Sequence, residues 1–396
     1  MEPFRVSSLA EMPGNMHILC LEQFSNLGGG QLALIGLLPA LRARGCQVRV
    51  ALPAEGPLAA KIRELGCAVD ILPFGFYPNG HKTFHDAVRY ARETPKLCRA
   101  IEQSVAEHRI DLLYVNAPRP LPAAAIAARR QSVPLVFHSH NRIGQPAAAC
   151  IAGCALRFAH ARVIACSHFA AEPLRAHIRP DALSVLYNGI APIASGPRPA
   201  RKLRRIGVIG RIETEKGQLD FVRAAWLLVR QFPDCLFTVV GAPSFSDNRY
   251  FEKVIRASRG LPIFFTGWRN DIAAVFENLD LLAVPSSPLE AAARVIVEAF
   301  AARVPVVAFP SGGIPEIIED GVTGFLTRAS TPEALARRMA DVLTMDCSRL
   351  RSVVNRAYKS WHATYTLDSY QQQVTDLLVG QVANLQTDWQ SAYLKA

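Results

Sequence analysis

Two cationic side chains follow a predicted strand in the second half of the chain. The run GRIETEKGQ, residues 210–218, comes directly after an apolar strand and before an amphipathic helix. Arg211 and Lys216 therefore leave the strand end together, beside a helix N-terminus whose free N–H groups also attract anions. These residue types at this spacing suit a diphosphate ligand. A solvated basic turn is the alternative interpretation.

Two carboxylates flank the start of another helix further along the chain. The segment PLEAAARVIVEAFA, residues 288–301, places Glu290 in the loop before the helix and Glu298 inside it. At ~1.5 Å of rise per residue, the two carboxylates lie on the order of 10 Å apart, enough to flank a diphosphate and hydroxyls at both of its ends. Carboxylates accept hydrogen bonds from vicinal diols, so sugar hydroxyls suit both positions. Glu298 taken alone fits an ordinary helix residue equally well.

Glycine-rich turns mark two further places where a backbone can approach a ligand closely. Gly312 and Gly313 precede a short helix that is predicted to start near Pro315. The run NLGGGQLAL, residues 26–34, gives a formal G-x-G-x-x-A match at Gly28, Gly30 and Ala33. However, the dinucleotide fingerprint needs its first glycine in the tight turn after the strand, and here it comes several residues later, so NAD binding is disfavoured.

Histidines supply the remaining candidate site residues. His138 and His140 end a predicted strand, where α/β proteins keep their site residues. His81 and His85 have the i, i+4 spacing of a metal pair, but no third ligand is evident, so we interpret them as surface residues and expect no metal. The sequence contains no G-x-S-x-G, P-loop or H-E-x-x-H motif, which leaves hydrolase, nucleoside-triphosphatase and zinc-protease functions without support.

Short apolar runs that alternate with helical patterns must position these residues. Such alternation is typical of parallel βαβ construction, and it restarts once, near residue 205. We predict strands at 17–21, 48–52, 112–116, 135–140, 163–167, 205–210, 236–241, 263–267, 281–286 and 306–309. The result is an α/β fold of two doubly wound lobes, 1–188 and 203–365, joined by a Pro-rich linker at 189–202. A helix over about 366–396 is expected to pack back on the first lobe.

The composition and charge of the chain indicate which kinds of binding partner to expect. The chain has 396 residues, is 50% hydrophobic and carries a net charge of +11. Residues 1–200 hold 21 basic and 13 acidic side chains (+8), and residues 201–396 hold 23 and 20 (+3), so an anionic partner is expected at the first lobe. The stretch 74–99 mixes aromatic and basic residues, which suits an anionic membrane surface, although a partly buried helix with a solvated basic face is the simpler interpretation.

Cysteine usage and hydropathy indicate the compartment. The nine cysteines are an odd number without any C-x-x-C pair, which fits a reducing cytoplasm. The sequence shows neither an export signal nor a run of ~20 apolar residues, so we expect any membrane contact to be peripheral, on the inner face of the membrane. The basic residues are not interleaved with a recognisable nucleic-acid motif, so no nucleic-acid partner is expected.

Taken in this order, these segments resemble the retaining GT-B glycosyltransferases, a large family that includes bacterial mannosyl-, glucosyl- and N-acetylglucosaminyl-transferases. The resemblance rests on the first-lobe glycines, His138, YNGI at 187–190, GRIETEKG, TGWRNDI at 266–272, the E-x7-E pair, and the GGIPEII and DGVTGFL runs. It implies two Rossmann-like lobes facing a cleft, with a nucleotide-sugar donor on the second lobe and the acceptor on the first.

The resemblance also implies roles for individual residues. Arg211 and Lys216 would hold the diphosphate, Glu290 the donor sugar and Glu298 the ribose, while Trp268 and Arg269 would lie along the base. The implied catalytic set is Glu290, His138, Lys216 and Arg211. The implied donor-binding set is Gly29, Gly30, Arg211, Lys216, Gly241, Trp268, Arg269, Ala293, Arg294, Val295 and Glu298.

The expected function is metal-independent transfer of a sugar, with retention, to a glycan or lipid-linked acceptor in cell-envelope or polysaccharide synthesis. One departure keeps alternatives open. Ala293 stands where the family usually has glycine, and a positive φ there would strain alanine by ~1 kcal/mol or more. A catalytically silent nucleotide-sugar binder or partner subunit, or a nucleotide-sugar epimerase on the same fold, are therefore the alternatives.

Overall fold

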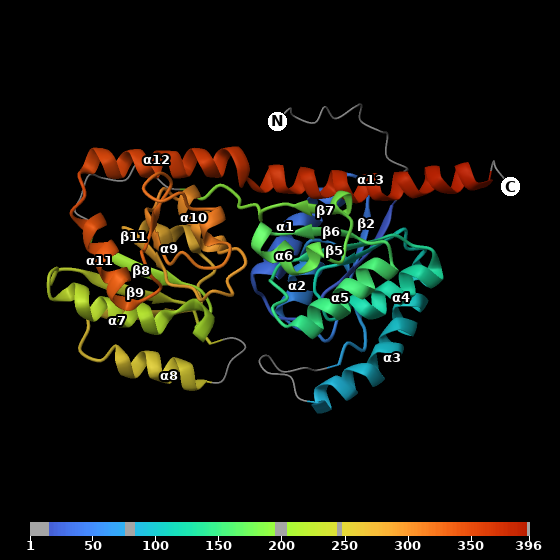
Figure 1. Cartoon of the computed structure of the whole chain (residues 1–396), viewed down its shortest axis with the longest axis horizontal. Helices are drawn as coiled ribbons and strands as arrows, with labels where there is room; N and C mark the ends of the chain where they lie inside the picture. Colours follow the sequence, from blue (N-terminus) through green and yellow to red (C-terminus); the bar gives the residue numbers. More distant parts are fainter. Residues whose placement is uncertain (1–15, 76–83, 195–203, 244–247, 394–396) are drawn as a thin grey trace.

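A computed structural model describes residues 16–75, 84–194, 204–243 and 248–393. Two parallel sheets, each covered by helices, form two lobes that lie side by side (Figure 1). The predicted α/β fold of two doubly wound lobes is confirmed.

The first sheet has seven parallel strands in the order β3-β2-β1-β4-β5-β6-β7. Strand β4 pairs with β1 rather than with β3, so the chain direction across the sheet reverses between β1 and β4. Ligands of such sheets bind at this switch point, outside the carboxyl ends of the strands. The strands are β1 His17–Leu21, β2 Gln47–Leu52, β3 Ala68–Ile71, β4 Leu112–Val115, β5 Leu135–Ser139, β6 Arg162–Ala165 and β7 Leu183–Val185.

Helices cover both faces of this sheet. Helices α3, α4 and α5 pack side by side on one face, and α1 packs with the C-terminal helix α13 on the other. The helices of the lobe are α1 Gly29–Ala43, α2 Pro57–Glu64, α3 Phe84–His108, α4 Leu121–Gln131, α5 Pro146–Phe158 and α6 His168–Arg175, with a 3₁₀ turn η1 at Pro180–Ala182. Because both faces are covered, the central strands are buried throughout and appear in the sequence as continuous apolar runs.

The second sheet repeats the plan with six parallel strands in the order β10-β9-β8-β11-β12-β13. Its switch point lies between β8 and β11. The strands are β8 Arg205–Ile209, β9 Leu236–Val240, β10 Ile263–Gly267, β11 Leu281–Val284, β12 Val306–Ala308 and β13 Phe325–Leu326. The helices are α7 Gln218–Val229, α8 Asn248–Ala257, α9 Ile272–Glu277, α10 Arg294–Ala301, α11 Pro332–Leu343 and α12 Cys347–Thr364, with 3₁₀ turns η2 Thr214–Lys216 and η3 Ile314–Glu316.

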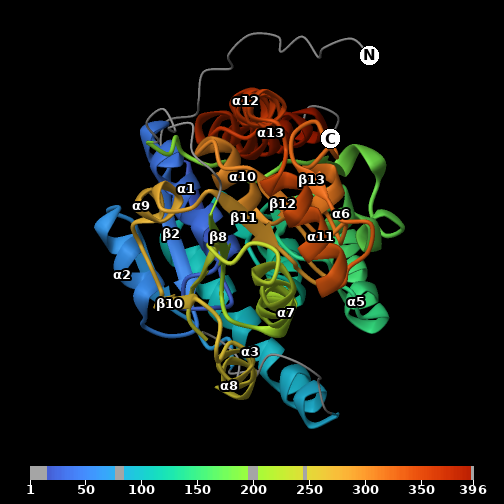
Figure 2. The ribbon, with the colours of Figure 1, turned by 90° about the vertical axis from the view of Figure 1, so that its left-hand side faces the viewer.

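Two helices run along one side of the molecule and connect the lobes (Figures 1 and 2). Helix α12 packs on the second lobe, and α13, Leu367–Tyr393, packs on the first through Tyr370, Val374 and Leu378. The junction of the two helices meets the start of the 189–202 segment, because Ile190 N–H donates to the Tyr365 carbonyl at 2.9 Å. The chain passes between the lobes twice, once after residue 188 and once between α12 and α13, and these two connections are hydrogen-bonded to each other. Residues 195–202 of the expected linker lie outside the described residues.

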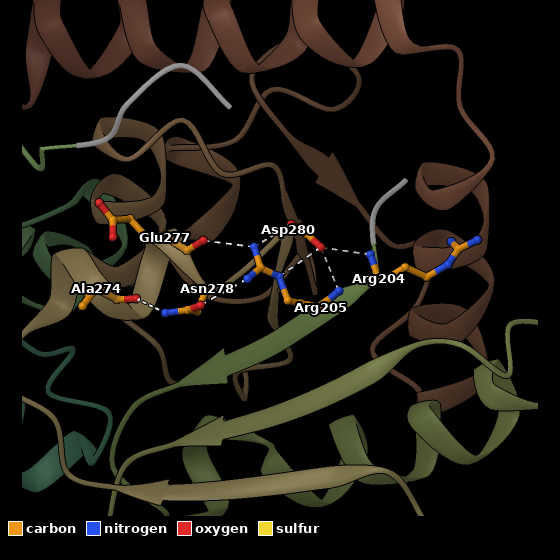
Figure 3. A network of polar contacts seen from close by, with 6 residues as sticks. All are labelled: Arg204, Arg205, Ala274, Glu277, Asn278 and Asp280. Atoms are coloured by element: carbon orange, nitrogen blue, oxygen red, sulfur yellow. Dashed lines mark hydrogen bonds and ion pairs between the residues drawn. The ribbon is translucent and has the colours of Figure 1, made fainter. Parts of the chain in front are cut away.

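A buried ionic network ties the amino ends of two central strands in the second lobe (Figure 3). Asp280, 4% exposed, precedes β11, and one of its carboxylate oxygens accepts the backbone N–H groups of Arg204 and Arg205, each at 3.0 Å. The Arg205 guanidinium also pairs with Asp280 at 3.1 Å. This edge is opposite to the carboxyl ends of the strands, so the network serves the fold rather than a ligand site.

All ten predicted strands form, within two residues of the predicted bounds, whereas β3, β7 and β13 are not predicted. The three missed strands are short and lie at or near sheet edges, where burial is too incomplete to leave an apolar run. His85 is exposed on α3, and His81 lies outside the described residues, as does the 76–83 part of the aromatic-basic stretch.

Candidate active site

The carboxyl ends of the second sheet bring together most of the predicted donor-binding residues. Arg211 and Lys216 follow β8, Gly241 follows β9, and Trp268 and Arg269 follow β10. Glu290 lies in the loop after β11, and Arg294, Val295 and Glu298 lie in α10. Parallel strands end at one edge of a sheet, so residues up to 87 positions apart in sequence meet here.

Three ion pairs organise this edge. Lys216 Nζ lies 2.5 Å from a Glu290 carboxylate oxygen, Arg211 pairs with Glu213 at 2.8 Å, and Arg294 pairs with Glu298 at 3.9 Å. The six side chains are 10–28% exposed, so they are neither fully buried nor free in solvent. Three cations and three carboxylates balance, so an anionic ligand at this edge would compete with the carboxylates for the cations. Burial raises the pKa of Glu298, and the positive charge of Arg294 partly opposes that shift.

Glycines hold the Glu290 loop at close range. A Cβ on Gly312, where φ is +55°, would lie 2.0 Å from the Glu290 carbonyl oxygen, and one on Gly313 would lie 2.1 Å from that of Ala291. The Gly313 N–H donates to the Glu290 carbonyl at 2.9 Å. The sequence suggested that these glycines approach a ligand. In the structure, the backbone that they approach is that of the Glu290 loop.

Ala293 causes no backbone strain. Its φ is −74° and its ψ is 86°, and its side chain is 2% exposed within the core of the second lobe. Alanine adopts a negative φ without the steric penalty of the left-handed region. The departure from glycine therefore gives no reason to expect a distorted site.

Gly241, Trp268 and Arg269 lie at the outer end of the same edge. A Cβ on Gly241, where φ is +143°, would overlap the Gly210 carbonyl oxygen at 1.9 Å, so glycine is required for the turns after β8 and β9 to touch. Trp268 is 43% exposed, and its indole N–H donates to Asn270 at 3.2 Å. Arg269 pairs with Asp271 on the surface. An exposed tryptophan beside this edge offers a flat apolar face to a ring.

The two lobes touch beside these residues. Glu316, in η3 of the second lobe, accepts the backbone N–H groups of His168 and Phe169 at 2.7 Å each, and the Tyr187 hydroxyl at 3.0 Å. The Glu316 carboxylate thereby caps the N-terminus of α6, a helix of the first lobe. A small apolar cluster that joins Ala165, Cys166, Ala170 and Ala171 to Ala291 continues the contact. Sequence reasoning missed this cap, because a carboxylate that caps a distant helix has no local pattern.

His138 and His140 differ from the expectation. His138 is fully buried, its Nδ1 lies 2.5 Å from the Tyr114 hydroxyl, and its ring stacks on that of His140 at 3.9 Å. It lies one layer behind His140, in the interior of the first lobe. His140 is the partly exposed residue of the two, beside Gly30, and burial together with the charge of Arg294 lowers its pKa to about 3. The structure thus places His140, rather than His138, next to the predicted donor-binding residues.

Gly29 and Gly30 begin α1, where Gly29 faces Arg294 of the second lobe and Gly30 faces His140 of the first. A Cβ on Gly29 would lie 3.6 Å from Arg294 Cδ, and one on Gly30 would lie 3.1 Å from the His140 ring. Two residues at the carboxyl edge of the first sheet, Glu22 and Asn116, are absent from the predicted set of site residues. Each directly follows an apolar strand, a signal that was available in the sequence but shared by many other residues.

Within the described ranges, no three His, Cys, Asp or Glu side chains are grouped so that they could hold a metal ion. No helix among the described residues is long and apolar enough to cross a bilayer.

Two family models match the chain in succession. Residues 27–192 match the model described as Glycosyltransferase Family 4, and residues 196–360 match Glycosyl transferases group 1. The first segment covers the first lobe from α1 to β7, without β1, and the second covers the sheet and most helices of the second lobe.

The chain is also similar to curated proteins that are named as glycosyltransferases. The chain is 26% identical to the phosphatidyl-myo-inositol mannosyltransferase of Mycobacterium leprae, over 85% of this chain and 89% of that protein. It is 31% identical to the D-inositol 3-phosphate glycosyltransferase of Mycolicibacterium gilvum, but that match spans 49% of this chain and about half, 46%, of the relative's length.

Solved structures share the fold over nearly the whole chain. The Anabaena protein Alr3699/HepE, in complex with UDP, superposes with a TM-score of 0.78 at 25% identity, covering 92% of this chain and all of that one. WaaG, described as a glycosyltransferase involved in lipopolysaccharide biosynthesis, gives 0.67 at 19% identity, covering 92% of this chain and all of that one, and shows the fold alone. Two paired Rossmann-like lobes, two consecutive family segments and these relatives together place the chain among the GT-B glycosyltransferases.

Proposed function

We propose that the protein transfers a sugar from a nucleotide-sugar to an acceptor, with retention of anomeric configuration and without a metal ion. The observation that carries the proposal is the pair of cationic side chains, Arg211 and Lys216, that follow the end of β8 at the carboxyl edge of the second sheet. The Anabaena structures are complexes with UDP and with UDP-glucose, which supports a nucleotide-sugar donor here.

The chemistry that this edge supports is stabilisation of a leaving group. As the sugar carbon gains oxocarbenium character, the departing diphosphate gains negative charge, and fixed cations lower the energy of that state. Lys216 forms an ion pair with Glu290. Exchange of Lys216 from Glu290 to the diphosphate would free the Glu290 carboxylate for a sugar hydroxyl. Arg211, Lys216 and Arg294 place three positive charges at this edge, and these charges can stabilise the diphosphate without a divalent metal.

Retention is proposed on the arrangement of carboxylates. A double-displacement mechanism needs two carboxylates close together around the sugar carbon. Each of the three carboxylates at this edge is paired with a cation, Glu213 with Arg211, Glu290 with Lys216 and Glu298 with Arg294, so none is free to act as a second carboxylate at the sugar carbon. A front-face reaction, in which the acceptor attacks from the side of the departing diphosphate, requires no second carboxylate.

We propose a glycan or lipid-linked acceptor presented at an anionic membrane, with the protein in the cytoplasm. The names of the mycobacterial relatives and the first-half charge of +8 support this acceptor class. Helix α3 contributes little of that charge, because it holds four basic (Arg and Lys) and four acidic residues. The outer side of α5 is the better candidate surface, since Ile151 and Phe158 are 52% and 54% exposed there and Arg129 lies over the Phe158 ring. The free state of all nine cysteines fits a reducing compartment.

The test is a donor panel in two steps. Thermal shift with UDP-, GDP- and ADP-sugars identifies the donor, since a ligand at 100 times its Kd adds roughly 2.7 kcal/mol of stability. The selected donor is then incubated with EDTA-treated enzyme, alone and with lipid extract. Transfer with an unchanged anomeric configuration supports the proposal. Inversion, or a strict need for added metal, contradicts it. Binding without turnover indicates a silent binder, and a changed sugar configuration with donor alone indicates an epimerase.

The membrane part has its own test. Flotation with vesicles that contain phosphatidylglycerol should carry the protein upward at low salt, and neutral phosphatidylcholine vesicles should not. Phe158→Ser should weaken flotation, whereas Phe264→Ser, which removes a 59% exposed phenylalanine from the second lobe, should not. Absence of flotation with anionic vesicles at low salt would contradict membrane presentation.

A further inference from the structure

Three polar residues stand side by side at the carboxyl edge of the first sheet. Glu22, Asn116 and His140 are each the first residue after a strand, namely β1, β4 and β5, which are neighbours in the sheet. Glu22 is 0% exposed and Asn116 is 3% exposed. The topology therefore builds a buried polar row from residues that are 94 and 24 positions apart in sequence.

Hydrogen bonds connect the row in one direction. One Glu22 carboxylate oxygen accepts the backbone N–H groups of Gln23 and Phe24, at 2.7 and 3.1 Å. The other accepts Asn116 Nδ2 at 2.6 Å, and the same amide nitrogen reaches the Gly30 carbonyl at 3.3 Å. Burial raises the pKa of Glu22 to about 7, so at pH 8 its ionised carboxylate accepts hydrogen bonds and does not donate them, and the same holds for the Gly30 carbonyl. Asn116 therefore has its NH₂ group toward Glu22 and Gly30, and its Oδ1 toward His140.

The orientation of Asn116 decides where His140 carries its proton. His140 Nε2 lies 2.8 Å from Asn116 Oδ1. Since Oδ1 can only accept, Nε2 must carry the proton, and Nδ1 of the neutral ring keeps its lone pair. Nδ1 is buried and has no hydrogen-bond partner among the described residues. Burial and the nearby positive charge of Arg294 lower the pKa of His140 to about 3, so the ring is neutral at physiological pH.

We propose that Glu22 and Asn116 are positioning residues that hold His140 in its Nε2–H tautomer, so that Nδ1 accepts a hydrogen bond from a substrate hydroxyl. An unpaired buried acceptor costs free energy that a substrate O–H would return on binding. The location fits that use, because His140 packs against Gly30, whose neighbour Gly29 packs on Arg294 of the donor-binding set. The identity of the substrate rests on the proposed function, whereas the tautomer follows from the hydrogen bonds alone.

A substitution at Glu22 tests the relay without touching His140. In Glu22→Gln, the amide oxygen stays with the two backbone N–H groups, so the new NH₂ group faces Asn116. Two facing donors force the Asn116 amide to turn, which presents Nδ2 to His140 and favours the Nδ1–H tautomer. A purely structural role of Glu22 would lower stability without moving the imidazole proton.

The experiment uses the full chain labelled with ¹⁵N-histidine at pH 8, and assigns His140 by the signals lost in His140→Gln. Imidazole ¹⁵N shifts distinguish the two tautomers. Wild type is expected to show Nε2–H at His140. A folded Glu22→Gln variant is expected to shift toward Nδ1–H and to lose roughly 10- to 100-fold in kcat/KM with the donor found by thermal shift, the range set by one unsatisfied buried hydrogen bond. The control is Ser104→Ala, which removes a buried hydroxyl of the first lobe and should change neither the His140 tautomer nor kcat/KM.

The outcomes separate clearly. An Nδ1–H tautomer of His140 in wild type overturns the proposal by itself. A folded Glu22→Gln variant also overturns it if the His140 tautomer or kcat/KM stays at the wild-type value. If Glu22→Gln does not fold, Asn116→Ala replaces it, because loss of Oδ1 should leave His140 as a mixture of tautomers. An unchanged tautomer there overturns the proposal. If wild type turns over no donor, the proposed function fails, while the tautomer of wild type still tests the relay.

Discussion

Lys216 and Glu290, 74 positions apart, form an ion pair of 2.5 Å between the ends of two adjacent parallel strands of the second sheet. The pair joins the residue proposed to hold the diphosphate to the residue proposed to hold the sugar. Substitution of Glu290 is therefore expected to change donor binding and turnover in different directions.

Glu290→Gln should lower kcat by roughly two orders of magnitude, because about 3 kcal/mol of transition-state stabilisation at the developing cationic carbon is lost. Affinity for UDP or the matching nucleoside diphosphate should rise about threefold, since Lys216 loses a competing carboxylate in a partly exposed pair. Steady-state kinetics and calorimetry measure the two effects. Wild-type turnover in this variant would show that the carboxylate is structural.

Glu298→Gln should raise the donor KM about tenfold and leave kcat nearly intact. A ribose contact is made equally in the ground state and the transition state, so its loss affects binding alone. Initial-rate measurements over a range of donor concentrations give both constants. A reduced kcat at unchanged KM would place Glu298 in the chemical step instead.

Glu316→Ala should loosen the contact between the lobes. The variant loses the cap of α6, which involves two backbone N–H groups and the Tyr187 hydroxyl. We expect a larger radius of gyration by small-angle scattering without ligand, and compaction when saturating donor is added. Glu319→Ala, in the same segment but exposed, is the control. Equal radii for the two variants would argue against an interlobe role of Glu316.

Glu22 should make stability depend on pH. Burial raises its pKa from 4.5 to about 7, so the native state holds a proton that the unfolded chain releases between these values. The contribution of the protonated form is fully present below pH 4.5 and is lost as the pH rises through 7. Relative to Glu22→Gln, wild type should therefore lose about 3 kcal/mol of unfolding free energy between pH 4.5 and pH 8. Urea titrations at both values measure the difference, and parallel pH profiles would contradict the assignment.

Asp280→Ala should destabilise the second lobe by roughly 3 kcal/mol, because it leaves Arg205 and two backbone N–H groups without their buried acceptor (Figure 3). The comparison is Asp234→Ala, which removes the largely exposed partner of Arg204 and should cost less than about 1 kcal/mol. Denaturant midpoints of the two variants give the answer. Similar losses would mean that burial of Asp280 adds nothing to its pair.

The second-lobe site could be predicted because its residues come in compact segments. Arg211 and Lys216 are five positions apart, and Glu290 and Glu298 are eight apart, so strand ends and helix starts define them locally. Buried parallel strands also reveal themselves as continuous apolar runs, which is why ten strands and the two-lobe plan follow from the sequence.

The first-lobe site was decided by the tertiary structure. His138 and His140 point to the same side of β5, and the sequence cannot tell which of them is enclosed, because the answer depends on Tyr114 of a neighbouring strand. Glu22 and Asn116 become partners only when β1 and β4 pair across the switch point of the sheet.

Ala293 shows the same division of information. The sequence determines that alanine stands where glycine is usual, and this alone suggests strain. Only the folded loop determines its φ of −74°, at which a Cβ carries no penalty. Local patterns specify which residues occur and which elements they begin or end. Backbone conformation, hydrogen-bond direction and contact between lobes arise from chain segments that meet only after folding, so the tertiary structure alone decided them.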